Sequence, residues 1–127
     1  MKKEVVNANG APAAVGPYSH AAKAGNLVMT SGQIGLIPET GALAEGIEGQ
    51  TRQVLENLKC VLAACGCEMK DVIKTVVFLA DIGDFAVVNG IYAEYFTKDE
   101  PARSCVQVAA LPKGALVEIE CVAVVPE

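Results

Sequence analysis

The 127-residue sequence lacks several features that would assign it to common classes of protein. It has no hydrophobic run near the ~20 residues of a membrane-spanning helix, and its first residues are not an apolar signal core. It has ten Lys and Arg residues against 15 Asp and Glu, a net charge of −5, and no basic cluster. Because phosphate binding needs clustered cations, nucleic acid is a poor candidate partner. We therefore predict a cytoplasmic protein without a membrane partner.

Metal ligands are also scarce. His20 is the single histidine, and the five cysteines make an odd number. Cys65 and Cys67 are separated by one residue instead of the two to four typical of zinc sites, and no second pair follows at a matching distance. We therefore predict no metal site, reduced thiols in a reducing compartment, and a structural role for His20.

Hydrophobic side chains, in contrast, are in surplus. They make up 52% of the residues, which is more than one compact core of this size needs. No repeat, low-complexity tract or charged block indicates a linker, so we predict one domain over residues 1–127. The surplus favours buried contacts between subunits.

Two amphipathic helices are predicted. Apolar residues recur at three-to-four spacing over Ile47–Ala64, and Gly66 can cap the end of this helix. A second apolar stripe runs over Asp84–Phe96 and includes Tyr92, with Asp84 as the candidate N-cap. Each helix needs a surface to cover.

The surface is supplied by segments rich in β-forming residues. Gly25-Asn26 is typical of a hairpin turn between two of them. The order of strands and helices predicts an α+β domain, a mixed sheet with both helices on one face. The predicted strands are Lys3–Val6, Tyr18–Ala24, Leu27–Ser31, Val72–Leu79, Ser104–Val108 and Leu116–Val125.

The last strand is apolar on both faces. Alternation places Val117, Ile119, Cys121 and Ala123 on one face, and the opposite face carries Glu118, Glu120, Val122 and Val124. Because two helices can cover only one side of the sheet, we expect another subunit to cover the other side.

The densest polar cluster among apolar residues spans 101–108, and a turn at 111–114 leads to a second segment at 117–120. Two strands joined by this turn can lie antiparallel. Alternation places Arg103, Cys105 and Gln107 on one face of the first strand. It places Glu118 and Glu120 on one face of the second strand. If the two faces coincide, an arginine and a glutamate share one patch. Two interpretations stay open: a stabilising ion pair, or a guanidinium that binds a substrate carboxylate while a free carboxylate handles protons.

Several separated motifs occur in order along the chain. They are Gly16–Ala21, Thr30–Ile34, Val76–Leu79 with Asp84, Phe85 and Asn89, Pro101–Val106, Leu111–Lys113 and Val117–Glu120. Through them the chain resembles, nearly end to end, the reactive intermediate deaminase (Rid, YjgF) family and its RidA branch. The resemblance implies a chorismate-mutase-like fold, assembled as a homotrimer with sheets packed inward and active sites between subunits.

The resemblance also implies an activity, the hydrolysis of 2-aminoacrylate, 2-iminopropanoate and 2-iminobutanoate to 2-keto acids and ammonia. This reaction needs no cofactor, because an iminium carbon is already electrophilic. Arg103 would bind the substrate carboxylate, and Glu118 would activate water and carry a proton, with Glu120 as the rival. The residues expected to line the cleft are Tyr18, Ser31, Gly32 through its backbone, Asn89 and Cys105.

Local roles compete with some of these assignments. Tyr18 can anchor a turn, and Asn89 can contact a loop. Cys105 has no histidine beside it to activate its thiol, so we predict an inert lining residue. Glu100 stands where relatives often have an aromatic residue before Pro101, which leaves the substrate side-chain pocket open to question.

Two other functions compete with the deaminase. One is a non-catalytic trimeric module that binds small carboxylic acids as a sensor or regulator. The other is a ribonuclease or chaperone-like protein, and the acidic net charge of −5 argues against RNA cleavage. Sensing a carboxylate needs Arg103 but no proton carrier, so Glu118 favours the enzyme.

Overall fold

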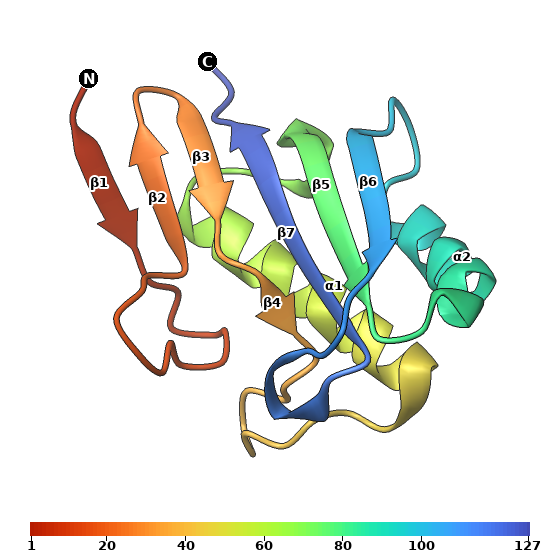
Figure 1. Ribbon diagram of the computed structural model, residues 1–127. Coiled ribbons are helices and arrows are strands. Elements are labelled where there is room, and N and C mark those ends of the chain that lie inside the picture. Colours follow the sequence, from red (N-terminus) through yellow and green to blue (C-terminus); the bar gives the residue numbers. More distant parts are fainter.

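The computed structural model describes all 127 residues. The chain forms one twisted sheet backed by two helices (Figure 1). The strand order is β1-β2-β3-β7-β5-β6, and β4 pairs with β7 beyond the end of β3. The β5–β6 pair is parallel and the others are antiparallel, which confirms the predicted mixed α+β fold. The strands are β1 (Lys3–Val6), β2 (Ala21–Ala24), β3 (Leu27–Thr30), β4 (Gln33–Ile34), β5 (Val72–Leu79), β6 (Ala102–Gln107) and β7 (Val117–Val124).

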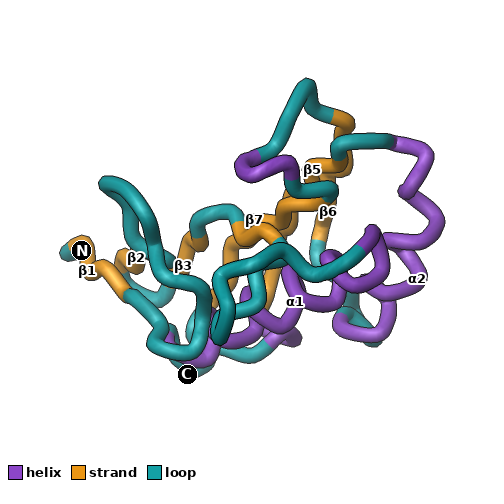
Figure 2. Tube along the Cα trace, turned by 90° about the horizontal axis from the view of Figure 1, so that it is seen from below, coloured by secondary structure: helices purple, strands orange, loops and turns teal.

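Both helices cover the same face of the sheet, as predicted (Figure 2). The long helix α1 (Gly46–Ala64) crosses behind the central strands, and α2 (Phe85–Tyr95) lies beside it near the β6 edge (Figure 1). Gly66 follows α1 with φ of +82°, and the backbone N–H groups of Gly66 and Cys67 donate to Ala63 and Leu62. This Schellman arrangement confirms the predicted cap. Neither helix is long and apolar enough to cross a membrane.

The core lies between α1 and the sheet. Leu55, Leu58 and Leu62 of α1 have no exposed surface, and they share one cluster with Val77 and Ile119 of the sheet. One polar side chain in this helix has a separate role. The buried Asn57 amide donates hydrogen bonds of 3.2 and 2.9 Å to the carbonyls of Ile34 and Leu36, which ties the β4 segment to α1.

Some predicted boundaries were wrong. The strand predicted from Tyr18 begins at Ala21, because His20 holds the preceding loop in a turned path: its Nδ1 accepts from the Ala8 N–H at 2.9 Å and its Nε2 lies 2.8 Å from the Pro12 carbonyl. This confirms a structural role for His20. Asp84 occupies the N-cap of α2 but makes no capping bond with its side chain.

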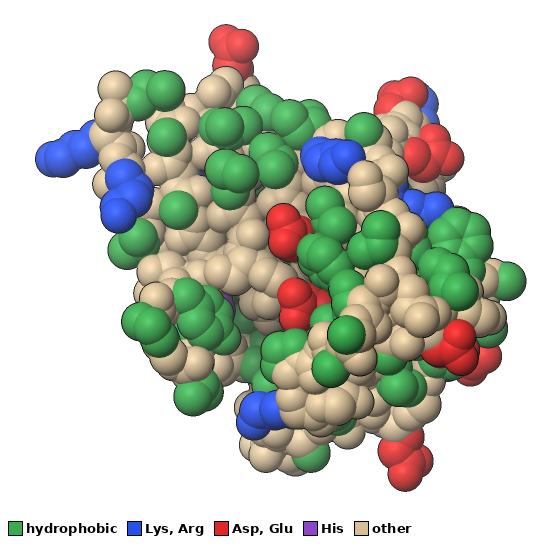
Figure 3. Space-filling model, viewed as in Figure 1, with side chains coloured by type: hydrophobic (Ala, Val, Ile, Leu, Met, Phe, Trp, Pro, Cys, Tyr) green, Lys and Arg blue, Asp and Glu red, His purple; other side chains and the backbone are tan.

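The face of the sheet away from the helices is uncovered in a single chain. Figure 3 looks onto this face and shows hydrophobic side chains spread over it, with acidic ones near its middle. Met29 is 56% exposed and Val106 is 44% exposed. The apolar residues that point this way are Leu27, Met29, Val76, Phe78, Val106, Val122 and Val124.

Candidate active site

Arg103 lies on β6 and points toward α2 on the helix-covered side of the sheet. Its Nη1 donates a 2.7 Å hydrogen bond to Oδ1 of Asn89. The guanidinium carbon lies 4.9 Å from the centre of the Tyr92 ring and 5.4 Å from that of Phe85. All three partners are neutral and all three come from α2, so the helix fixes the cation without neutralising it.

No carboxylate forms an ion pair with Arg103. The side-chain ion pairs of the chain are Arg52–Glu94 and Lys70–Glu68, both at the surface. The interpretation of Arg103 as half of a stabilising ion pair is therefore wrong. The guanidinium instead borders a hollow of about 420 Å³, and the exposed Glu100 lies on the lining of the same hollow without pairing to it.

Glu118 borders a second and larger hollow of about 520 Å³. Its walls come from the 8–20 loop, the segment after β3 and the turn before β7. Ser31 donates a 2.6 Å hydrogen bond from Oγ to the Ser19 carbonyl, which holds two of these segments together. The lining residues are Pro12, Ala13, Val15, Tyr18, Ser31, Gly32, Gln33, Ile34, Leu36, Pro112, Lys113 and Glu118.

Gly32 packs directly against the Glu118 carboxylate. A Cβ atom built on Gly32 would overlap the carboxyl group of Glu118, so any other residue would displace it. Glu118 is half-buried, and this desolvation, together with the negative charge of Glu120, raises its carboxyl pKa. Glu120 shares the open face of β7 but does not line the hollow, so the geometry favours Glu118 over its rival.

The condition for Arg103 and Glu118 to share one patch of a single chain, that the faces of two adjacent strands coincide, is not met. Strand β5 lies between β6 and β7, so the two strands are not neighbours. Arg103 is aligned with Thr75 of β5, whose side chain is buried toward the helices, whereas Glu118 is aligned with Phe78, which faces the open side. The cation and the carboxylate therefore lie on opposite faces of one sheet.

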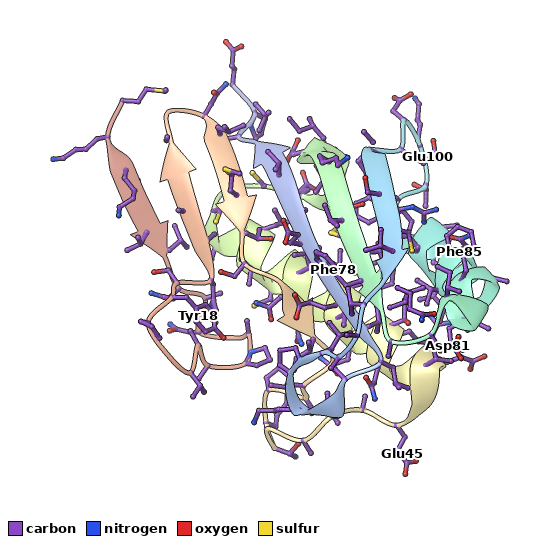
Figure 4. All side chains as sticks on the ribbon, in the orientation of Figure 1. Tyr18, Glu45, Phe78, Asp81, Phe85 and Glu100 are labelled. Carbon is purple, nitrogen blue, oxygen red and sulfur yellow. The ribbon has the colours of Figure 1, made fainter.

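The predicted site residues thus divide into two groups. Arg103 and Asn89 line the hollow beside α2, and Cys105 lies on the same face of β6 as Arg103 but lines neither hollow. Tyr18, Ser31, Gly32 and Glu118 surround the second hollow. Figure 4 shows this separation through labelled neighbours: Tyr18 lies on the loop side of the sheet, Phe85 lies on α2 at the other side, and Phe78 lies between them. We call the two groups the arginine half-site and the glutamate half-site.

Cys105 follows Arg103 on the same face of β6. Its partial burial raises the pKa of its thiol, and the nearby Arg103 opposes this shift only in part. The single histidine is fully engaged by Ala8 and Pro12, so nothing activates this thiol. No group of three or more His, Cys, Asp or Glu side chains is arranged to hold a metal ion.

Sequence reasoning missed two contributors to the arginine half-site. Tyr92 was assigned only to an apolar stripe, and Phe85 only to a family motif. The sequence did contain one signal for Tyr92: a phenol hydroxyl within an apolar helix stripe needs a hydrogen-bond partner. Its hydroxyl lies 2.7 Å from Oγ1 of the buried Thr75, and its ring supports Arg103.

Comparison with known proteins assigns the family. The family model described as Endoribonuclease L-PSP matches residues 8–125. This chain belongs to the Endoribonuclease L-PSP (YjgF/RidA) family. RidA relatives include the chloroplastic Reactive Intermediate Deaminase A of Arabidopsis thaliana, which is 56% identical over 97% of this chain and 66% of its own length. The 2-iminobutanoate/2-iminopropanoate deaminase of Salmonella typhimurium is 49% identical over 98% of both chains.

Solved structures of family members have the same fold. A crystal structure of a putative endoribonuclease L-PSP from Entamoeba histolytica superposes with a TM-score of 0.94 at 53% identity, over 97% of this chain and 99% of the other. A structure of E. coli TdcF with bound serine gives 0.91 at 42% identity, over 95% and 98%. These neighbours confirm the predicted α+β fold, a mixed sheet with two helices, for the single chain.

Proposed function

We propose that this chain is an enamine and imine deaminase that hydrolyses 2-aminoacrylate, 2-iminopropanoate and 2-iminobutanoate to 2-keto acids and ammonia. The observation that carries the proposal is the environment of Arg103, whose contacts are neutral and which borders an open hollow. An uncompensated guanidinium suits two parallel hydrogen bonds to a carboxylate. The names of close relatives support this substrate class.

The reaction requires positioning and proton transfer. Arg103 binds the carboxylate and so presents C2 of the iminium to water. Glu118 accepts a proton as the water oxygen bonds to C2 and the C=N electron pair moves to nitrogen. The same proton then passes to nitrogen, the C–N bond breaks as ammonia leaves with its electron pair, and Glu118 takes the hydroxyl proton as the ketone forms and returns it to the ammonia. 2-Aminoacrylate enters this sequence after a proton adds to C3, which converts it to the iminium of 2-iminopropanoate. The raised pKa of Glu118 makes its carboxylate a stronger base than an exposed glutamate, which suits a group that accepts a proton and then returns it.

One chain cannot present both groups to a substrate of a few atoms, because its own sheet separates them. We therefore place each active site between two copies, with the arginine half-site of one facing the glutamate half-site of the next. A head-to-tail contact of this kind closes into a ring when its rotation allows, and a homotrimer with the open sheet faces packed inward is such a ring. The apolar open face supports this assembly.

The remaining parts of the proposal concern the setting of the enzyme. We propose that residues 1–127 form one domain of the RidA type and that the protein is cytoplasmic. One relative is named chloroplastic, so location differs among relatives. The chain would act on a small substrate and would need neither a metal nor an organic cofactor.

A non-catalytic carboxylate-binding module is the second candidate. The bound serine in the structure of TdcF favours it, because serine carries a carboxylate and is not an imine. The raised pKa of Glu118 distinguishes the two functions, since carboxylate capture needs no proton carrier. Ribonuclease activity has the family description behind it, and the net charge of −5 opposes it.

A coupled assay tests the activity. A serine or threonine dehydratase releases the imine, and keto-acid formation is followed with wild type, Arg103→Ala and Glu118→Gln. We expect wild type to accelerate the reaction, Arg103→Ala to lose substrate binding, and Glu118→Gln to lose about a hundredfold or more in kcat. No acceleration by wild type, with pyruvate still bound, would establish the sensor in place of the enzyme.

Mixing the two inactive variants tests the shared site. After denaturation and refolding together, a neighbour pair with intact Arg103 from one chain and intact Glu118 from the next forms one complete site. Random mixing in a head-to-tail ring makes about a quarter of the sites complete. Recovery near this fraction supports the shared site, and the absence of recovery from soundly refolded oligomers would contradict it.

A further inference from the structure

Tyr92 contacts Arg103 in the arginine half-site, and Tyr92 is itself hydrogen-bonded to a buried residue behind it, Thr75. The Tyr92 ring lies under the guanidinium at 4.9 Å, and its hydroxyl lies 2.7 Å from Oγ1 of Thr75. Thr75 is fully buried and is aligned directly with Arg103 in the β5–β6 register. Sheet and helix therefore both hold the ring: the sheet through Thr75 and the helix through its backbone.

We propose that Tyr92, anchored by Thr75, is a positioning residue that holds the Arg103 guanidinium ready for the substrate carboxylate. The inference rests on the proposed function and adds to it two residues with no contact assigned to substrate. The ring acts through its face, and the hydroxyl acts only as the anchor.

The geometry supports a positioning role over simple core filling. Tyr92 is 6% exposed and also packs against Phe96, with ring centres 4.5 Å apart, so a further contact besides those with Arg103 and Thr75 restricts its orientation. A cation over an aromatic face is stabilised by the ring quadrupole, more strongly where water is excluded. Unlike a carboxylate, the ring leaves the full positive charge available.

The same arrangement explains why Arg103 is ordered without a salt bridge. A free arginine side chain loses rotamer freedom when it binds a ligand, and this loss weakens binding. The Asn89 hydrogen bond fixes one edge of the guanidinium, and the Tyr92 ring fixes its plane. The cost of ordering is then met during folding instead of during substrate binding.

The test compares substitutions that separate the ring from the hydroxyl. Tyr92→Leu removes the aromatic face, and we expect KM for 2-iminopropanoate to rise about 3- to 30-fold with kcat nearly unchanged. Tyr92→Phe keeps the face, and we expect KM within about threefold of wild type. Thr75→Val removes the same hydrogen bond from the other side and also keeps the face, so we expect a KM within about the same threefold of wild type.

A purely structural role would give a different pattern. Misfolded enzyme lowers the active fraction and hence apparent kcat, whereas the folded fraction keeps the wild-type KM. An unchanged KM in Tyr92→Leu, or an equal rise in Tyr92→Phe, would overturn the proposal. If Tyr92→Leu does not fold, Tyr92→Met provides the same comparison, because its flexible side chain fills the space without an aromatic face.

Direct binding of pyruvate, measured by calorimetry, separates this inference from the proposed function. Pyruvate carries the carboxylate but needs no hydrolysis. If wild type binds pyruvate yet does not hydrolyse imines, the proposed function fails. The role of Tyr92 is then tested by comparing the Kd for pyruvate between wild type and the Tyr92 variants. If Tyr92→Leu binds pyruvate as tightly as wild type does, the positioning role fails while the deaminase can stand.

Discussion

The two half-sites are built in different ways. The arginine half-site lies on a strand and a helix: Arg103 comes from β6, and its partners Asn89, Tyr92 and Phe85 come from α2. Most of the glutamate half-site consists of loops, and only Glu118 and the short β4 lie on strands. Regular elements thus hold the group that we propose binds the substrate carboxylate, and loops shape the space around the group that we propose carries the proton.

The difference in construction matches the difference in task. Bidentate recognition of a carboxylate is sensitive to small displacements, and packed elements keep these small. The chemistry at Glu118 depends more on desolvation and on room for water, which the loops provide. Substitutions in the arginine half-site should therefore change mainly KM, and substitutions in the glutamate half-site should change mainly kcat.

Breaking the arginine half-site should give the largest effect. In Arg103→Lys the charge remains but the planar fork and its stacking on Tyr92 are lost. Losing one charge-assisted hydrogen bond predicts a fall in kcat/KM of about 10- to 100-fold, expressed mainly in KM. Steady-state kinetics with 2-iminopropanoate measure it.

Arg52→Lys is the matched control, because Arg52 is an exposed arginine paired with Glu94 on the outside of the helices. It should keep wild-type kinetics. Equal activity of Arg103→Lys and wild type would show that a point charge is sufficient and that the planar geometry is irrelevant.

Breaking the glutamate half-site should come next. Gly32→Ala places a methyl group where the Glu118 carboxylate lies, so the carboxylate must move. We expect kcat to fall about tenfold or more while KM changes little, because proton transfer is impaired and the carboxylate anchor is intact. The backbone at Gly32 does not require a positive φ, so the change is not a test of backbone strain.

Gly90→Ala provides the comparison. Gly90 lies on α2, and a Cβ atom there meets open space. Alanine also favours a helix more than glycine does, so this variant should be at least as stable as wild type and fully active. A Gly32→Ala enzyme with unchanged kcat would separate Glu118 from the chemistry.

The contrast between the half-sites also explains what the sequence could predict. Helix α1 was placed to within one residue of its start, because an apolar period of 3.6 is a local signal. The faces of β6 and β7 were also predicted correctly, since alternation is local. The order and register of strands are not local: β5 lies between β6 and β7, and it pairs Arg103 with Thr75 but Glu118 with Phe78, so the two side chains lie on opposite faces.

The loops of the glutamate half-site were harder to predict. The path from Tyr18 to His20 depends on hydrogen bonds that join the His20 ring to the N–H of Ala8 and the carbonyl of Pro12, 12 and eight residues away. Strand β4 has two residues, too few for an alternating pattern, and it is held by Asn57 of α1. Motif resemblance identified Ser31 and Gly32, and only coordinates show that Gly32 makes room for Glu118.

A smaller effect should sharpen the assignment of the proton carrier. The negative charge of Glu120 helps to raise the Glu118 pKa, so Glu120→Gln should lower that pKa. A general base works only when deprotonated, so the acid limb of the kcat/KM profile should shift to lower pH in Glu120→Gln. If the acid limb stays in place, Glu120 does not raise the pKa of the catalytic base, and if activity is lost at every pH, Glu120 carries the proton instead of Glu118.

The smallest expected effect concerns substrate choice at the arginine half-site. Glu100 is exposed on the wall of the hollow that Arg103 borders, so it repels negative charge that enters there. A substrate with two carboxylates should suffer more than one with a single carboxylate. Glu100→Gln should therefore raise kcat/KM for 2-iminosuccinate relative to 2-iminopropanoate by up to about fivefold, the size typical of exposed charge pairs.

Ionic strength tests the electrostatic origin of this preference. Screening should shrink the difference between Glu100→Gln and wild type as salt rises, because the interaction crosses solvent. Glu45→Gln is the matched control, since Glu45 precedes α1 far from Glu100 and its side chain makes no capping bond (Figure 4). A ratio unaffected by Glu100→Gln at low salt would mean that substrates approach Arg103 from another side, and the arginine half-site would then discriminate by shape instead of charge.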